Sequence, residues 1–158
     1  MNFKKNSVRF LIWWSKLKLY KFISFTLLMT YIILIPLIPF IEPVDSFENR
    51  FDYIRIISAI TFAPFFETLI FQALVIFIIK RFLTKNFIVL VLISACFFGI
   101  IHFYNVYYVL YAMFLGLIFA SGYILYLRNK SWEDAALAIM LVHALRNSIA
   151  IIISFILR

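Results

Sequence analysis

Residues 56–79 read IISAITFAPFFETLIFQALVIFII, and this stretch holds one charged side chain, Glu67. A helix needs roughly 20 mostly apolar residues to cross a bilayer, so the stretch predicts a membrane-spanning helix. The whole chain has the same character, since 66% of its residues are hydrophobic and 14% are charged; an average soluble domain has about 45–50% and 25%. This composition excludes water-soluble globular, collagen-like and disordered proteins. We therefore expect a chain that is solvated by lipid.

Four further apolar stretches lie between clusters of charge, at residues 22–41, 87–104, 107–127 and 135–157. The stretches at 87–104 and 107–127 almost meet, so they are predicted to form a tight helical hairpin. The expected fold is all-α, a polytopic membrane helix bundle of about five transmembrane helices. Residues 22–158 form this bundle as one domain without a linker.

A basic amphipathic segment, residues 1–21, precedes the bundle. Phe10, Trp13, Trp14 and Leu17 recur at helical spacing while the basic side chains face elsewhere, a pattern typical of a helix that lies in the membrane interface. We assign Trp13 and Trp14 to the aromatic belt at that interface. The alternative is a helix that docks a partner protein.

The formal net charge of +8 is unevenly placed along the chain. Most lysines and arginines precede the first predicted span or follow the second and the fourth, and the positive-inside rule then predicts a cytoplasmic N-terminus and an outside C-terminus in the cell membrane. Basic residues in such positions contact anionic lipid, so no nucleic-acid partner is expected. The residues concerned are Lys4, Lys5, Arg9, Lys16, Lys18, Lys21, Lys80, Arg81, Lys85, Arg128 and Lys130.

Few ionisable side chains lie inside the predicted spans, namely Glu67, His102, His143 and Arg146. An ionisable group at bilayer depth is costly, so each is by default a functional candidate. Asn147 follows His143 by one helical turn, which places both side chains on one helix face. A carboxylate, two imidazoles and an amide are a suitable set for moving a proton and for holding an oxyanion.

Each of these residues also has a purely structural explanation. A protonated Glu67 can hydrogen-bond a backbone group, His102 can contact the headgroups, and His143 can hold two helices together. Arg146 is expected to snorkel toward the membrane interface. The functional interpretation therefore depends on whether the side chains meet.

The convergence of Glu67, His102 and His143 is a geometric prediction. With about 1.5 Å of rise per residue, their depths along the predicted spans differ by about 10 Å. Pro64 has no N–H and leaves the carbonyl of Ile60 without its helical donor, so it can kink the helix beside Glu67. We expect this kink and helix tilt to bring the three side chains together.

Three short motifs follow one another along the chain: PFFETLIFQ at residues 64–72, FGIIH at 98–102 and HALRN at 143–147. In this order they resemble the CPBP family of intramembrane proteases, which is named for CAAX proteases and bacteriocin-processing enzymes and is also called the Abi family. The resemblance covers a core of about residues 58–150.

The resemblance implies a role for each matching residue. Glu67 matches the first glutamate of the family's EExxxR motif, which activates a water together with the FxxxH histidine, here His102. His143 and Asn147 match the pair that stabilises the tetrahedral oxyanion. Phe98 begins the FxxxH motif and is expected to support the site.

The sequence departs from the EExxxR motif at two positions, where Thr68 stands for the second glutamate and Gln72 for the arginine. The two positions are one helical turn apart, so in other members they are suited to an ion pair. Both replacements are neutral and can still hydrogen-bond, which leaves no orphan charge in lipid. We expect Thr68 and Gln72 to support the site or to bind substrate, with a substrate preference that differs from members that carry the arginine.

A metal site is the alternative chemistry for the same residues. Glu67, His102 and His143 match the His₂Glu ligand set of catalytic zinc, but the zinc motif HExxH is absent. Cys96 is the single cysteine, which excludes a disulfide framework and a Cys-based metal site. We expect no cofactor, with zinc as the alternative.

The expected function is that of an intramembrane endopeptidase that hydrolyses a peptide or protein substrate, in bacteriocin or peptide maturation or in self-immunity. The alternative is a non-catalytic membrane protein that sequesters a peptide or scaffolds a partner. A proton-coupled transporter is disfavoured because no internal repeat is visible. The expected partners are the substrate, the lipid bilayer and, for so short a chain, a second copy or another membrane protein.

Overall fold

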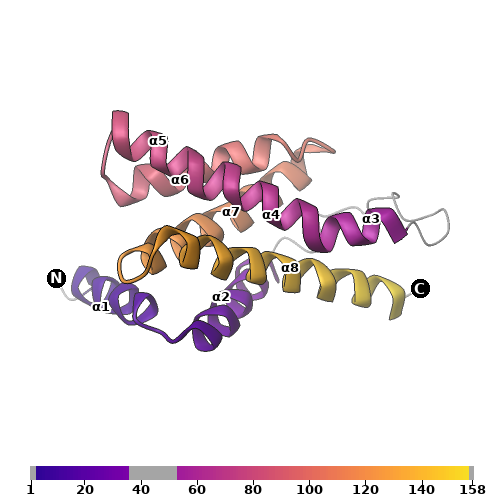
Figure 1. The fold of residues 1–158 in the computed structure, drawn as a ribbon, viewed down its shortest axis with the longest axis horizontal. Helices are drawn as coiled ribbons and strands as arrows, with labels where there is room; N and C mark the ends of the chain where they lie inside the picture. The colour runs from indigo at the N-terminus through magenta and orange to yellow at the C-terminus, as the bar shows by residue number, and fades with distance from the viewer. Residues whose placement is uncertain (1–2, 36–52, 157–158) are drawn as a thin grey trace.

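The computed structural model describes residues 3–35 and 53–156. All regular secondary structure in these two ranges is helical (Figure 1), so the predicted all-α class is confirmed there. Residues 36–41 of the first predicted span lie outside the described ranges.

Two short helices, α1 (Phe3–Ser15) and α2 (Leu19–Leu34), begin the chain. A long helix, Tyr53–Phe82, follows, and two π-helical segments interrupt its α-helical register. Its parts are α3 (Tyr53–Ile57), η3 (Ser58–Phe62), α4 (Ala63–Glu67), η4 (Thr68–Leu74) and α5 (Val75–Phe82). The remaining helices are α6 (Phe87–Ile100), α7 (Val106–Leu127) and α8 (Trp132–Ile156).

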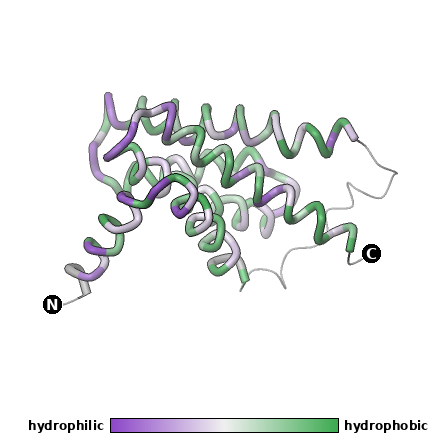
Figure 2. The backbone as a smooth tube through the Cα atoms, turned by 60° about the horizontal axis from the view of Figure 1, so that its bottom comes forward, coloured by the Kyte–Doolittle hydropathy of each residue, from purple (hydrophilic) through white to green (hydrophobic). Residues whose placement is uncertain are grey.

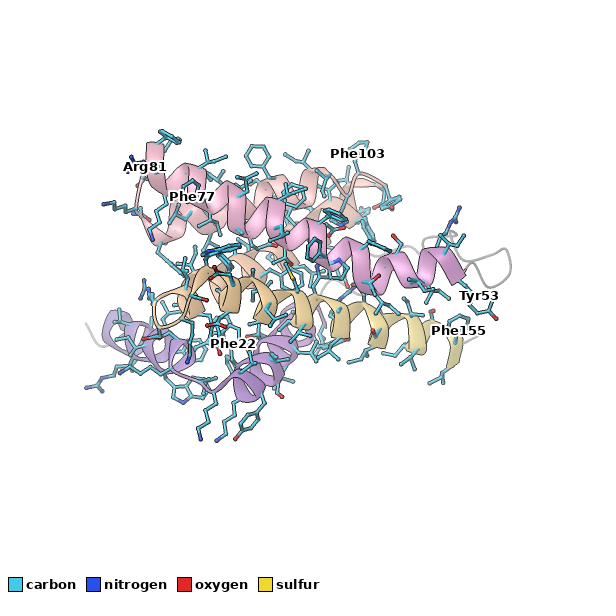
Figure 3. The ribbon with its side chains drawn as sticks, in the orientation of Figure 1. Phe22, Tyr53, Phe77, Arg81, Phe103 and Phe155 are labelled. Atoms are coloured by element: carbon cyan, nitrogen blue, oxygen red, sulfur yellow. The ribbon has the colours of Figure 1, made fainter. Side chains whose placement is uncertain are left out.

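The long helix packs beside α8 and runs in the opposite direction (Figure 1). Figure 3 shows Tyr53 and Phe155 at one end of this pair and Arg81 at the other. The hairpin of α6 and α7 lies behind the pair, and α2 packs against both α7 and α8. The α6–α7 hairpin and α8 therefore both lie against the middle of the long helix.

Within the described residues, three helices are long and apolar enough to cross a membrane: Tyr53–Phe82, α7 and α8. The helices α2 and α6 are apolar but shorter, so the predicted five complete spans are not seen. With the 14 residues of α6 and about 1.5 Å of rise per residue, this helix is roughly 21 Å long, less than the ~30 Å of a hydrocarbon core. The chain is thus a multi-pass membrane protein in which α6 is shorter than the thickness of an ordinary hydrocarbon core.

The α6–α7 hairpin is confirmed, and small residues let its helices approach closely. A Cβ on Gly116 would come within 2.9 Å of the Ala95 Cα on the facing helix. The turn is defined at its far side by Asn105, whose side chain accepts the backbone N–H of Tyr108 at 2.8 Å and so caps α7. Asn86 caps the start of α6 in the same way, as short polar side chains do at helix N-termini.

The helix α1 packs against α2 through Trp14, which corrects its assignment to an interface belt. Trp14 is only 5% exposed, and its Nε1–H donates to Thr26 Oγ1 at 3.1 Å. Its ring also packs on Phe22, which in turn packs on Tyr126 of α7 with ring centroids 4.3 Å apart. Trp13 is 48% exposed, as an interface residue is expected to be.

The outward surface of the bundle is apolar. Phe77, Ile88 and Ile152 are each more than half exposed, which suits contact with lipid tails. Figure 2 shows that the helices are hydrophobic over most of their length, with hydrophilic residues gathered where α5 is followed by α6. The cover of the bundle is therefore lipid rather than water.

Candidate active site

Glu67, His102 and His143 meet, although they come from three separate elements. Glu67 ends α4, His102 lies in the turn after α6, and His143 lies in the middle of α8. The His102 Nε2 is 3.5 Å from Glu67 Oε2, and the His143 Nε2 is 3.8 Å from the same oxygen. The predicted convergence is confirmed. The depth difference of about 10 Å that straight spans would give does not keep the three side chains apart.

The π-helical segments on both sides of α4 explain how Glu67 reaches this position. In η3 the N–H of Ala63 bonds the carbonyl five residues back, a register that is rare and frequent at functional sites. Pro64 has no N–H to continue it, so the carbonyl of Ala59 lacks its backbone donor. The side chain of Asn147 replaces that donor, with Nδ2 at 2.9 Å from the Ala59 oxygen. The expectation that Pro64 frees the Ile60 carbonyl is therefore corrected, because the register is one of five residues rather than four.

The tautomer of His102 follows from its second ring nitrogen. Nδ1 lies 2.7 Å from the Phe98 carbonyl oxygen, which can only accept, so Nδ1 carries a hydrogen. Nε2 then faces the carboxylate of Glu67. Two acceptors do not approach each other without a proton between them, so this pair shares at least one proton, on the imidazole or on the carboxyl.

His102 lies outside the three long helices that can span a membrane, and opposing effects set the pKa of its imidazole. Burial lowers the pKa of the imidazole, whereas the hydrogen bonds with Glu67 and the Phe98 carbonyl and the negative charge of Glu67 raise it. The net direction is upward from 6.5. The surroundings of His102 therefore favour its imidazolium form.

Aromatic rings hold His143, which is 4% exposed. The ring of Phe119 lies 4.9 Å and that of Phe98 5.8 Å from the imidazole centroid. Nδ1 of His143 is buried and has no hydrogen-bond partner. Packing rather than hydrogen bonding thus fixes the imidazole plane with Nε2 directed at Glu67.

Phe98 touches both histidines. Its ring centroid is 4.7 Å from that of His102 and 5.8 Å from that of His143, and its carbonyl bonds His102. The side chain is 1% exposed. The structure thus places Phe98 where a supporting residue is expected.

Thr68 and Gln72 lie next to Glu67 on η4 and are completely buried. The expected hydrogen bond between them is absent, because neither the Thr68 hydroxyl nor the Gln72 amide has a hydrogen-bond partner. The physical reason is the π register of η4, in which residues four apart are not in the i,i+4 relation of an α-helix. Buried polar atoms left open in this way are unusual and are commonly met by ordered water.

Asn147 is placed differently from the other predicted residues. Its amide contacts Ala59, as described, and its Oδ1 accepts from Arg146 Nη1 at 3.4 Å. The amide therefore holds η3 against α8, a role that the sequence did not suggest. Tyr108 was also not identified from the sequence, although its ring lies 6.2 Å from that of His102; its only sequence signal is a place near the start of the helix after the FxxxH motif.

The zinc alternative finds no support in the arrangement of the side chains. Among the residues that the structure describes, no group of three or more His, Cys, Asp and Glu side chains could hold a metal ion. The two imidazole nitrogens point at the carboxylate oxygen itself.

A sequence model for the Rce1-like type II CAAX prenyl endopeptidases matches residues 49–149 of the chain. The match includes Glu67, His102, His143 and Asn147, and it covers well over half of the 158 residues. The chain belongs to this family. No curated protein and no solved structure matches the chain.

Membership in the Rce1-like family confirms the resemblance to CPBP proteases and implies an intramembrane protease. The matched residues span the long helix, the hairpin and the first part of α8. The helices α1 and α2 lie before the match. The elements that the family shares are thus those that carry the site.

Proposed function

We propose that this Rce1-like protein is an intramembrane endopeptidase in which Glu67 and His102 activate a water. The observation that carries the proposal is the approach of two imidazole nitrogens to a single oxygen of Glu67, at 3.5 and 3.8 Å. The Glu67 side chain is 20% exposed and that of His143 is 5% exposed. Such a site is sheltered, which strengthens electrostatic interactions; Oε2 of Glu67 is buried, while the side chain as a whole is partly exposed.

The chemical step is a hydrolysis in which the Glu67 carboxylate takes a proton from water. The resulting hydroxide forms a bond to the carbonyl carbon of the substrate, and His143 donates a hydrogen bond to the oxyanion. Collapse of the tetrahedral intermediate breaks the C–N bond, and the proton on Glu67 passes to the leaving nitrogen. An imidazolium at His102 stabilises the negative charge that develops during the step.

The buried polar atoms around Glu67 support a place for water. Thr68 Oγ1, both amide atoms of Gln72 and Nδ1 of His143 are buried without hydrogen-bond partners. Polar atoms of this kind are normally satisfied by ordered water. We assign Thr68 and Gln72 to the support of the site or to substrate binding, and we keep for Asn147 a second contact with the oxyanion.

The proposed orientation has the N-terminus in the cytoplasm and the C-terminus outside the cell membrane. Lys80, Lys85 and Arg128 come from two separate helix ends and line one pocket of about 160 Å³. Basic residues gathered at one end of a bundle favour the cytoplasmic side and anionic lipid. The proposed partners are the bilayer and a peptide or protein substrate, in peptide or bacteriocin maturation or in self-immunity, with a second copy or a membrane partner completing so small a bundle.

Cleavage of a library of membrane peptides by the purified protein in detergent tests the proposal. Glu67→Gln removes the base and retains size, and its matched control is Glu133→Gln, the same change at an exposed residue in the first turn of α8. We expect Glu67→Gln to lower the rate by about 10²–10⁴-fold, the usual contribution of a general base. Glu133→Gln is expected to leave the rate unchanged.

The outcomes separate the three functions considered. Equal cleavage by Glu67→Gln and wild-type protein contradicts the proposed mechanism. Loss of cleavage with a chelator and recovery with Zn²⁺ assigns the chemistry to a metal site. A protein that cleaves nothing, while wild type and Glu67→Gln bind the same peptide equally well, is a non-catalytic binding or immunity protein.

A further inference from the structure

Arg146 of α8 carries a charge that no acidic side chain meets in the described part of the chain. Its guanidinium lies over the ring of Tyr111, 5.0 Å from the centroid, and Nη1 contacts Asn147 Oδ1. Nε is buried and has no hydrogen-bond partner. Within the described ranges, the carboxylate of Glu67 pairs with His102 and His143 and not with Arg146.

The position of the guanidinium corrects the expectation that Arg146 snorkels. The helix α8 continues for ten residues after Arg146, to Ile156, and a snorkelling side chain extends toward the membrane interface. Here the guanidinium turns to Tyr111 of α7 and to Asn147, inside the bundle. An arginine inside a membrane bundle that meets no carboxylate of the described residues is costly and marks a functional site by default.

A pocket lies next to this arginine. It has a volume of about 210 Å³, and its walls include Arg146, Asn147 and Ser154 of α8, Ala59 of η3 and Tyr108 of α7. Among the residues that the structure describes, those that line it include no acidic side chain. The pocket thus offers one positive charge, polar groups and an apolar floor.

The pocket adjoins the candidate active site through two of its walls. The ring of Tyr108 lies 6.2 Å from that of His102. Asn147 lies one helical turn after His143, which is a rise of about 6 Å along α8. A ligand in the pocket is therefore a neighbour of a peptide bond at Glu67.

We propose that Arg146 binds a carboxylate of the peptide substrate in this pocket, at the chain terminus or on an acidic side chain, with Asn147 orienting the guanidinium. The inference rests on the proposed function, since it names the substrate class of the same site. A guanidinium is planar and binds carboxylates through paired N–H donors. The contact with Tyr111 covers one face of the group and Nη1 bonds Asn147, so the donors that remain for a ligand include Nε, which has no partner.

Equilibrium binding of three fluorescein-labelled probes in detergent tests this inference. All share one apolar octapeptide of alanine, leucine and phenylalanine: the first ends in a free carboxylate, the second in an amide, and the third in an amide with one internal glutamate. The binding protein is full-length Glu67→Gln, alone and combined with Arg146→Gln, Arg146→Lys or Arg128→Gln. Arg128→Gln is the matched control because it removes an arginine that lies over Phe87, away from the pocket.

We expect one carboxylate probe to bind Glu67→Gln about tenfold more tightly than the amide probe, as for a charge-assisted hydrogen bond. Arg146→Gln is expected to remove this preference, Arg146→Lys to reduce it, and Arg128→Gln to retain it. The tighter of the two carboxylate probes identifies the source as the terminus or the acidic side chain. Binding of the amide probe reports that each variant is folded.

The inference is overturned if neither carboxylate probe binds better than the amide, or if the preference survives Arg146→Gln. Binding is measured without turnover, so its result does not depend on hydrolysis. A wild-type protein that fails to cleave while the Arg146-dependent preference is present rejects the proposed function alone. Cleavage without the preference rejects the inference alone.

Discussion

The α6–α7 hairpin and the contact between the long helix and α8 are built differently, although each joins two apolar helices. In the hairpin both helices keep α-helical register, and Gly116 brings them together. In the other contact the long helix changes register twice, and Asn147 bonds the backbone of its partner. Close packing of apolar and small residues holds the hairpin together, whereas polar groups meet between the long helix and α8.

Buried polar side chains give a second contrast, between the hydrogen-bonded contact of α6 with η4 and the polar residues of η4 beside Glu67. Ser94 of α6 donates to the Phe71 carbonyl at 2.8 Å. Thr68 and Gln72 of η4 are as fully buried as Ser94 and have no partner. Unmet polar atoms cost stability, so their concentration beside Glu67 indicates that this part of the bundle serves function at the expense of packing.

The largest effect, on the hydrolysis rate, is expected from a change in the contact between the long helix and α8. His143→Asn removes the donor that faces Glu67, whereas His143→Gln extends an amide N–H toward the same position. We expect His143→Asn to lower the hydrolysis rate by about 10²–10³-fold, the usual loss for one oxyanion donor, and His143→Gln to lower it less. Equal rates for His143→Asn and wild type contradict the assignment of His143 to the oxyanion.

In the α6–α7 hairpin, an added methyl group is expected to lower stability. Gly116→Ala places its Cβ 2.9 Å from the Ala95 Cα, which is backbone, whereas Gly122→Ala meets the movable end of Ile139 at 2.9 Å. We expect Gly116→Ala to lower the free energy of unfolding by about 1–3 kcal/mol. Gly122→Ala, the same change on the same helix, is expected to cost less because Ile139 can rotate away. Thermal unfolding in detergent checks the order, and a larger loss for Gly122→Ala contradicts it.

A smaller effect compares the two kinds of buried polar residue directly. Gln72→Leu removes unmet polar atoms and is expected to raise the free energy of unfolding by roughly 1 kcal/mol, while lowering hydrolysis. Ser94→Ala removes a made hydrogen bond and is expected to lower the free energy of unfolding by about 1 kcal/mol. If both variants lose stability to the same extent, Gln72 has a partner and the contrast between the two regions fails.

A stability effect of about the same size is expected at Asn147, the residue that joins the two regions. Asn147→Ala leaves the Ala59 carbonyl without its side-chain donor and is expected to lower the free energy of unfolding by about 1 kcal/mol. Hydrolysis is the second readout for this variant. An unchanged rate restricts Asn147 to holding η3, and a fall beyond about 10²-fold supports its additional contact with the oxyanion.

Much of the fold follows from the distribution of apolar and charged residues. The positions of the helices and the tight hairpin were predictable because apolar stretches end at clusters of charge or at short turns. The length of α6 was not, because apolar composition continues to Tyr104 although the helix ends at Ile100. The burial of Trp14 was also missed, since helical spacing cannot distinguish lipid from a neighbouring helix.

The candidate site was predictable in its members but not in its contacts. The order of the motifs indicated that Glu67, His102 and His143 converge, and they do. The π register was not visible, because Pro64 shows only that one donor is missing and not which carbonyl lacks it. The contact of Asn147 with Ala59 and the inward turn of Arg146 both depend on tertiary structure.

The short α6 has a consequence for the lipid around the protein. At roughly 21 Å, this helix is matched to a thinner hydrocarbon layer than the ~30 Å of an ordinary bilayer. Lipids beside it are expected to compress, or the turn that carries His102 lies below the surface of the membrane. In both cases the path of water to Glu67 shortens as the acyl chains shorten. If the proposed function holds, we expect the hydrolysis rate to rise in proteoliposomes of short-chain lipid.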